Sequence, residues 1–326
     1  MKENEIRDAG VLDEYLRKVG QDVKSLFDFS SFAYVACPAC GSPDHERRFD
    51  KTGFFYVSCR RCATLFVNPR PLFDALNRFY SESESTSFWI SRFFKPVAEA
   101  RRVKIFRPRA EYVYNIIESD KQLTIGDIGA GFGLFLEEMC SLMRGSSYVA
   151  IEPSLEMAGI CREKGLHTLG ESLESVSGMD GRFDLLTAFE LLEHLYDPRS
   201  FLKKVHLLLK PGGRFLMTSL NGMGFDILVL GDKSKSVSPP HHLNFFNPAS
   251  IRRLLGDAGF DVEEVTTPGK LDWDIVEGMI KSGKADPGRF WNALSREGSD
   301  KAKSELQEWI SRNDMSSHMR LLAKKA

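Results

Sequence analysis

The chain has 326 residues, 42% hydrophobic and 27% charged, a composition typical of a globular protein of about two domains. Its formal net charge of −1 gives no overall attraction to nucleic acid or to an anionic membrane surface. No run approaches the roughly 18 consecutive apolar residues of a membrane span, and residues 1–30 lack the apolar centre of a signal peptide. We therefore expect a cytoplasmic protein.

Four of the six cysteines form two Cys-x-x-Cys pairs, Cys37 with Cys40 and Cys59 with Cys62, separated by residues 41–58. This spacing is typical of a four-thiolate zinc site, in which a hairpin brings both pairs around one tetrahedral ion. Four protein ligands leave the metal no open position, so we expect a structural role. A redox dithiol or two disulfides are the alternatives, and a cytoplasmic setting disfavours the disulfides.

Helical periodicity dominates residues 73–118, with a polar, serine-rich break near residues 81–87. Beyond it, short apolar segments alternate with helical ones. Strands are expected at residues 123–129, 147–153, 166–172, 182–190, 214–221 and 261–267. This alternation predicts an α/β fold with a doubly wound, parallel sheet covered by helices on both faces.

The first of these strands ends in a glycine-rich turn that contains Asp127, Gly129, Gly131 and Gly133. Glycines let backbone amides approach a ligand closely, and doubly wound sheets bind ligands at this edge. The dinucleotide-binding pattern needs a further glycine where this chain has Leu134, which weakens a nicotinamide prediction. Glu152, after the second strand, can accept two hydrogen bonds from a ribose diol, which fits any adenosine cofactor.

Five motifs in order resemble the class I methyltransferases that use S-adenosylmethionine (SAM): GDIGAGFG, AIEP, FDLLTAFELLEHLYDP, LKPGGRFLMTSLN and LLGDAGF. They cover roughly residues 110–270. The resemblance implies a seven-stranded, mostly parallel sheet whose last strand, in SHMRLLAKKA, is antiparallel. The implied domains are a helical leader (1–36), a zinc ribbon (37–72), a helical connector or lid (73–118) and a SAM-binding domain (119–326) with a helical insertion at about 272–312.

Carried over by motif, the resemblance also implies the residues of the donor site. The methionine end of SAM would lie against Asp127, Gly129, Gly131 and Gly133, and the ribose against Glu152. The adenine would lie near Ser172 and Leu173, and the methyl group beside Phe189 and Glu190.

The ribbon followed by LFVNPRP is also similar to a bacterial subgroup that includes sugar C-methyltransferases, which carry a zinc module before the SAM domain. This resemblance implies a small-molecule acceptor, a sugar or sugar nucleotide, with the ribbon as a brace or lid. The core also resembles ubiquinone-pathway O-methyltransferases, so a quinone-like or phenolic acceptor is the alternative. A non-catalytic SAM-binding module is a further alternative. An RNA acceptor is disfavoured by the near-neutral charge.

Two groups of residues are candidates for removing a proton from the acceptor. Glu190, Glu193 and His194 have a spacing that would place them on one helical face. His241 and His242 lie in a proline-bounded loop. Three hypotheses remain open. In the first, His241 or His242 is a general base with Glu190 beside it. In the second, Glu190, Glu193, His194 and His242 bind a divalent cation, which is implied by the resemblance of this pattern to small-RNA 2′-O-methyltransferases and ubiquinone-pathway O-methyltransferases. In the third, these residues only brace the fold.

Overall fold

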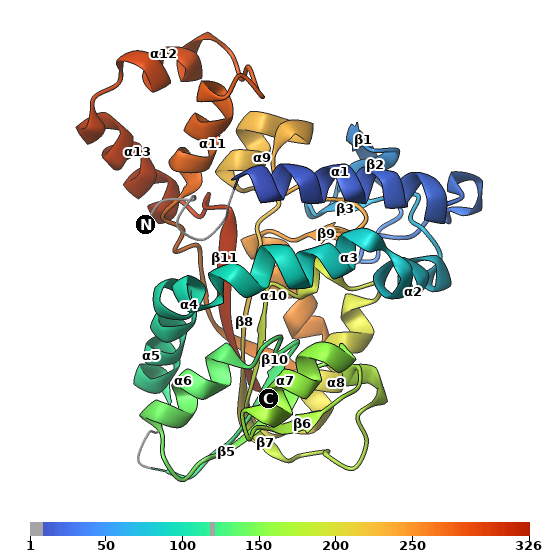
Figure 1. Cartoon of the computed structure of the whole chain (residues 1–326), viewed down its shortest axis with the longest axis vertical. Helices are drawn as coiled ribbons and strands as arrows, with labels where there is room; N and C mark the ends of the chain where they lie inside the picture. Colours follow the sequence, from blue (N-terminus) through green and yellow to red (C-terminus); the bar gives the residue numbers. More distant parts are fainter. Residues whose placement is uncertain (1–8, 118–120) are drawn as a thin grey trace.

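Two sheets organise the molecule in the computed structural model, which describes residues 9–117 and 121–326 (Figure 1). Residues 1–8 of the expected leader, and residue 119, where we expected the SAM-binding domain to begin, lie outside the described residues. No helix in the described ranges combines the length and the apolar character needed to cross a membrane.

The larger sheet has seven strands in the order β10-β11-β8-β7-β4-β5-β6. Their bounds are β4 Thr124–Ile128, β5 Ser147–Ile151, β6 His167–Leu169, β7 Phe183–Phe189, β8 Leu209–Leu220, β10 Phe260–Thr266 and β11 His318–Lys325. The five strands from β8 to β6 are parallel, whereas β11 runs antiparallel to both β8 and β10. The predicted seven-stranded sheet with an antiparallel last strand is confirmed, and that strand lies inside the sheet.

Helices cover both faces of this sheet, as the alternation predicted. They are α5 Arg107–Ile116, α6 Leu134–Leu142, α7 Leu155–Glu163, α8 Pro198–Leu208 and α10 Pro248–Asp257. One apolar cluster joins α5 and α6 to the sheet, and another joins α8 and α10 to its other face. Side chains begin several helices: Asn247 and Ser250 form a capping box at α10, and Asp197 caps α8.

The smaller sheet is antiparallel, with strand order β1-β2-β3-β9. Its strands are β1 His45–Lys51, β2 Phe54–Cys59, β3 Leu65–Val67 and β9 Asn244–Phe245. Strand β9 belongs to the second half of the chain and begins two residues after His242. The long helix α1 Ala9–Leu26 packs on an apolar cluster that it shares with β2, β3 and β9. The ribbon is therefore built into the domain of the larger sheet, because one strand of the ribbon's sheet comes from that part of the chain.

The connector between the sheets is helical for most of its length: α2 Phe73–Glu82, α3 Glu84–Phe88 and α4 Ala98–Arg101 precede α5. The break expected near residues 81–87 is limited to Ser83, because its hydroxyl accepts the amide of Thr86 and starts α3 at once. Helices α11 Asp272–Lys281, α12 Arg289–Glu297 and α13 Asp300–Arg312 pack around an apolar cluster shared with α9 Phe225–Leu230, and appear at the upper left of Figure 1.

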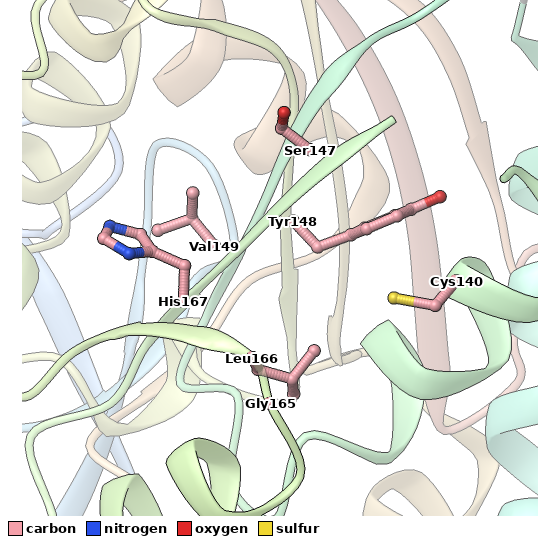
Figure 2. Close-up of a pocket in the computed structure, with 7 residues that line it drawn as sticks. All are labelled: Cys140, Ser147, Tyr148, Val149, Gly165, Leu166 and His167. Carbon is pink, nitrogen blue, oxygen red and sulfur yellow. The ribbon is translucent and has the colours of Figure 1, made fainter. Parts of the chain in front are cut away.

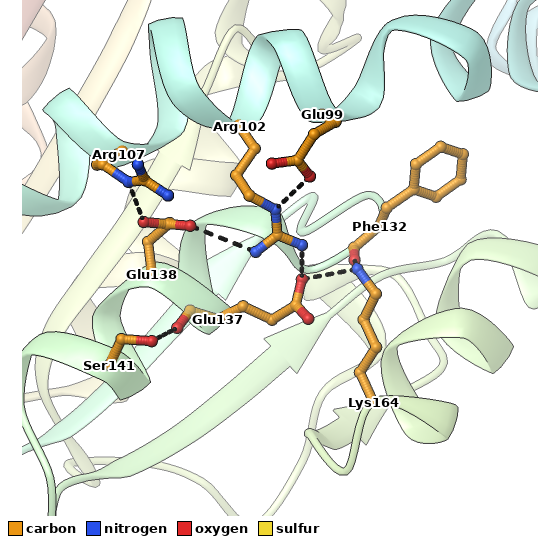
Figure 3. A network of polar contacts seen from close by, with 8 residues as sticks. All are labelled: Glu99, Arg102, Arg107, Phe132, Glu137, Glu138, Ser141 and Lys164. Atoms are coloured by element: carbon orange, nitrogen blue, oxygen red, sulfur yellow. Dashed lines mark hydrogen bonds and ion pairs between the residues drawn. The ribbon is translucent and has the colours of Figure 1, made fainter.

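Ion pairs fix the end of the connector to the helix that follows the glycine turn (Figure 3). Arg102 contacts Glu137 at 2.7 Å and Glu138 at 3.3 Å, both on α6. Lys164 contacts Glu137 and also donates to the carbonyl oxygen of Phe132, inside the glycine turn. The connector, α6 and the glycine turn therefore form one charged network.

Candidate active site

The glycine turn has the backbone geometry that its sequence predicts. Gly129, Gly131 and Gly133 have φ values of 69°, 56° and 71°, in the left-handed region that favours glycine. A Cβ atom on Gly133 would lie 2.6 Å from the side chain of Leu166, whereas one on Gly131 would meet nothing within 4 Å. Gly133 thus allows the start of α6 to pack closely against Leu166. Gly131 lies beside open space at the carboxyl edge of the sheet.

Glu152 lies against this turn. One carboxylate oxygen accepts the amide of Gly131 at 2.8 Å, and the other accepts the amide of Ser154 at 2.9 Å. Burial raises the pKa of Glu152, although both amides oppose the shift. The structure thus brings together the glycine turn and the acid that the sequence placed at the ribose.

Asp127 is buried at the end of β4 and accepts a 2.6 Å hydrogen bond from the Thr187 hydroxyl. Burial raises its pKa to about 7, against the opposing effects of Thr187 and Arg109. A carboxyl group poised near neutral pH at the carboxyl edge of such a sheet is typical of a functional site.

Glu190 adopts a left-handed backbone conformation, with φ 53°. Its Oε1 accepts the Thr218 hydroxyl at 2.6 Å and contacts Arg109 Nη2 at 3.2 Å, and its Oε2 lies 2.9 Å from His318 Nδ1. Burial alone would raise the pKa of Glu190, but His318 and Arg109 outweigh it and hold the pKa well below its usual range. Glu190 is therefore an ionised carboxylate between two basic groups.

Arg109 and His318 were not predicted from the sequence. Arg109 lies on α5, before the first recognised motif, and His318 begins the last strand, far from the others in the chain. Arg109 also lies over the ring of Phe189, 4.6 Å from its centroid. The only available signals were a basic residue one helix before the glycine turn and a histidine at the start of a strand, neither of which is specific.

The expectation that Glu190, Glu193 and His194 share one helical face is wrong. The chain turns at Glu190, and only Leu192–His194 form a short 3₁₀ turn. Thr218 and Ser219 are consecutive on β8 and point to opposite faces; Thr218 binds Glu190, whereas Ser219 donates to Glu193 at 2.9 Å. The two carboxylates are thereby separated.

Glu193 and His194 instead lie with His242, and one ligand atom from each lies within 4.8 Å of the others. The amide of Leu243 donates to the carbonyl of Glu193 at 2.8 Å and joins the two loops. Burial, and then the charge of Glu190, raises the pKa of Glu193 to about 8. Burial and the neighbouring His242 lower the pKa of His194 well below its usual value.

The remaining predicted residues have different surroundings. His241 is buried, its Nε2 lies 2.7 Å from the Tyr15 hydroxyl, and burial lowers its pKa to about 3. Leu173 is buried in a short turn after β6, next to Ser172, and Phe189 packs edge-on against Phe135. Ser172 and Leu173 follow the end of β6, and Phe189 is the last residue of β7. Phe189 contacts the network of Arg109 and Glu190 through the guanidinium group over its ring.

The four cysteines of the ribbon lie together. Each Sγ is within 4.8 Å of the others, and the pairs Cys37–Cys62 and Cys40–Cys59 are separated by 3.5 Å. A disulfide would need about 2.05 Å. Thiolates at about 2.3 Å from a tetrahedral zinc ion are about 3.8 Å apart, so the arrangement fits zinc.

A pocket elsewhere in the molecule, lined by residues 140, 147–149 and 165–167, includes the start of β5 and none of the site residues that the sequence predicted (Figure 2).

Comparison with known proteins agrees with this geometry. Residues 97–265, more than half of the chain, match the model of a methyltransferase domain family. The ubiquinone biosynthesis O-methyltransferase of Xanthomonas euvesicatoria pv. vesicatoria is 31% identical over 174 residues, covering 48% of this chain and 70% of the relative. That of Xanthomonas campestris pv. campestris is 26% identical over 217 residues, covering 61% and 88%.

Among solved structures, a chain from the complex between the Haloferax volcanii Trm112 methyltransferase activator and a methyltransferase superposes with a TM-score of 0.51 at 17% identity. The alignment covers 73% of this chain and 96% of that chain, and the likeness concerns the fold alone. The family match spans most of the strands of the large sheet, and the first of these relatives is 31% identical over 70% of its own length. The chain therefore belongs to the SAM-dependent methyltransferases.

Proposed function

We propose that this enzyme transfers the methyl group of SAM to a hydroxyl group of a small molecule. The observation that carries the proposal is the partly exposed polar set that follows β7, where ionised Glu190 lies beside Arg109 and His318 and a second group contains buried Glu193. A hydroxyl acceptor must lose a proton during transfer, and such groups can position it and accept that proton.

The donor would lie along the carboxyl edge from Asp127 to Glu152. SAM carries an ammonium and a carboxylate at its methionine end, and buried Asp127 and half-buried Arg109 are groups of the complementary charges. Glu152 would accept the ribose hydroxyls, with Ser172 and Leu173 toward the adenine. SAM supplies an electrophilic methyl group, and these residues hold it in line with the acceptor.

Proton release should accompany SAM binding if Asp127 receives the ammonium. Because burial raises the pKa of Asp127 to about 7, the carboxyl is partly protonated at neutral pH and must ionise to pair with a cation. SAM affinity should therefore rise with pH, by about tenfold per unit below pH 7. Calorimetry between pH 5.5 and 7.5, in buffers of different ionisation enthalpy, measures both effects. A pH-independent affinity with no proton release contradicts this placement, and Asp127→Asn should abolish the dependence.

Two acceptor classes have support. The curated relatives are named as ubiquinone biosynthesis O-methyltransferases, which favours a phenolic or quinone-like acceptor. The ribbon, which is joined to the loop carrying His242, favours the sugar or sugar nucleotide of the zinc-containing subgroup.

Methyl transfer to a panel of acceptors distinguishes these classes. Purified enzyme with isotopically labelled SAM should methylate either polyprenylated phenols and catechols or nucleotide sugars, detected by mass spectrometry as one added methyl group on oxygen. RNA should remain unlabelled. Labelling on carbon contradicts the hydroxyl proposal. Tight SAM binding without turnover on any member of the panel favours a non-catalytic module.

We also propose that Glu193, His194 and His242 bind a divalent cation. Their three ligand atoms are close enough to share an ion, and a cation would offset the unfavourable ionisation of buried Glu193. Such an ion lowers the pKa of a bound hydroxyl. Calorimetric titration of the zinc-loaded protein with Mg²⁺ or Mn²⁺ should show one site, lost in His242→Ala and kept in His206→Ala on α8. No heat with either ion, or equal binding by both variants, contradicts the proposal.

A further inference from the structure

His318 stands outside every motif, yet it lies in the network described above. It begins β11 directly opposite Leu220, the last residue of β8, and so lies at the carboxyl edge of the sheet. Two residues further along β11, Arg320 pairs with Thr218, and alternation along the strands places His318, Arg320 and Thr218 on one face. This is the face covered by α5, because Arg320 lies 3.6 Å from the ring centroid of Tyr112.

The bond between His318 and Glu190 defines which ring nitrogen carries the proton. An ionised carboxylate can only accept hydrogen bonds, so Nδ1, at 2.9 Å from Oε2, must be the donor. In the neutral ring the basic lone pair then lies on Nε2. Arg109 and Thr218 hold the other carboxylate oxygen, so Glu190 cannot rotate away without losing both contacts.

The side chain of His318 is 43% exposed, whereas Glu190 is 29% exposed and Arg109 22% exposed. The imidazole is therefore the outermost member of the group, with a route for a proton to reach water. His241, the earlier candidate base, is 8% exposed and already bonded to Tyr15.

We propose that His318, oriented by Glu190, is the general base that deprotonates the acceptor. This inference rests on the proposed transfer to a hydroxyl. The acceptor oxygen forms a bond to the methyl carbon while the carbon–sulfur bond breaks and its electron pair passes to sulfur, leaving a neutral thioether. The hydroxyl proton passes to Nε2 of His318. The resulting imidazolium is stabilised by Glu190 and returns the proton to water.

A spectroscopic experiment tests which ring nitrogen of His318 carries the proton, and it needs no methyl-accepting substrate. In ¹⁵N-labelled protein, correlation spectra of the imidazole rings should show His318 with its proton on Nδ1, the signal being assigned by its loss in His318→Asn. Glu190→Gln should shift the ring toward the Nε2–H form. A wild-type ring protonated on Nε2, or one unaffected by Glu190→Gln, overturns the dyad.

A kinetic experiment tests the base itself. His318→Asn keeps an amide donor where Nδ1 stood but removes the base, so kcat should fall by about 10²–10⁴-fold while the SAM affinity stays unchanged. His167→Asn, the same change on β6 in the lining of the separate pocket of Figure 2, is the matched control and should keep wild-type kcat. Wild-type kcat in His318→Asn overturns the proposal. A wild-type enzyme that methylates no acceptor contradicts the proposed function instead, while the spectra still decide the dyad.

Discussion

Replacing Glu152 by alanine is expected to weaken SAM binding by at least about 100-fold. The substitution removes the carboxylate, and with it two charge-assisted hydrogen bonds to the ribose that would each contribute about 1.5–3 kcal/mol to SAM binding. The substitution also removes the hydrogen bonds that the Glu152 carboxylate accepts from the amides of Gly131 and Ser154. These two bonds connect the glycine turn to the start of α7. Isothermal titration with SAM and with its demethylated product measures the loss for both ligands.

The matched control is Glu156→Ala, which removes an exposed carboxylate from the first turn of the same helix. Its SAM affinity should equal that of the wild type. Thermal unfolding of the ligand-free Glu152→Ala protein distinguishes lost ligand contacts from a misfolded turn, because only the second lowers Tm substantially. Unchanged SAM affinity in Glu152→Ala would mean that the cofactor lies elsewhere, and the placement of the whole donor site would fail with it.

The sheet and the turn at 127–133 were predictable because their causes are local. Alternating apolar segments determine strands and helices, and left-handed turns require glycine at fixed positions, as at Gly129 and Gly133. The cysteine pairs were predictable for the same reason, since metal-ligand spacing is a short-range property. In each case a few neighbouring residues carry the complete signal.

The partners of the acidic residues were not predictable, because they depend on how distant segments meet. Glu190 and Glu193 are three residues apart, and helical spacing would put them together. The left-handed conformation at Glu190 sends one toward His318 and the other toward His242. The contact of His241 with Tyr15 joins residues 226 positions apart. No periodicity in the sequence records such contacts.

The second prediction with a large effect is the loss of thermal stability when zinc is removed from the ribbon. We propose that Cys37, Cys40, Cys59 and Cys62 bind one zinc ion there. Chelation, or the double change Cys59→Ser with Cys62→Ser, should lower Tm by about 10 °C or more, because structural zinc contributes many kcal/mol to folding. Metal analysis should give one zinc per chain. Cys140→Ser, which alters a partly buried thiol on α6, is the control and should keep both zinc and Tm.

Loss of zinc should also reduce catalysis, because the ribbon supports the loop that carries the histidines. The Tyr56 hydroxyl on β2 donates to the carbonyl of His242 at 2.8 Å, and Asn247 donates to the carbonyl of Cys62 at 2.9 Å. The Tyr56→Phe variant distinguishes support of the His242 loop from overall stability of the fold. It removes one hydrogen bond of about 1 kcal/mol, so Tm should change by only a few degrees. Its kcat should nevertheless fall, since the backbone at His242 loses its anchor. A zinc-free protein with wild-type Tm contradicts the structural site, and full activity in Tyr56→Phe limits the ribbon to stabilising the fold.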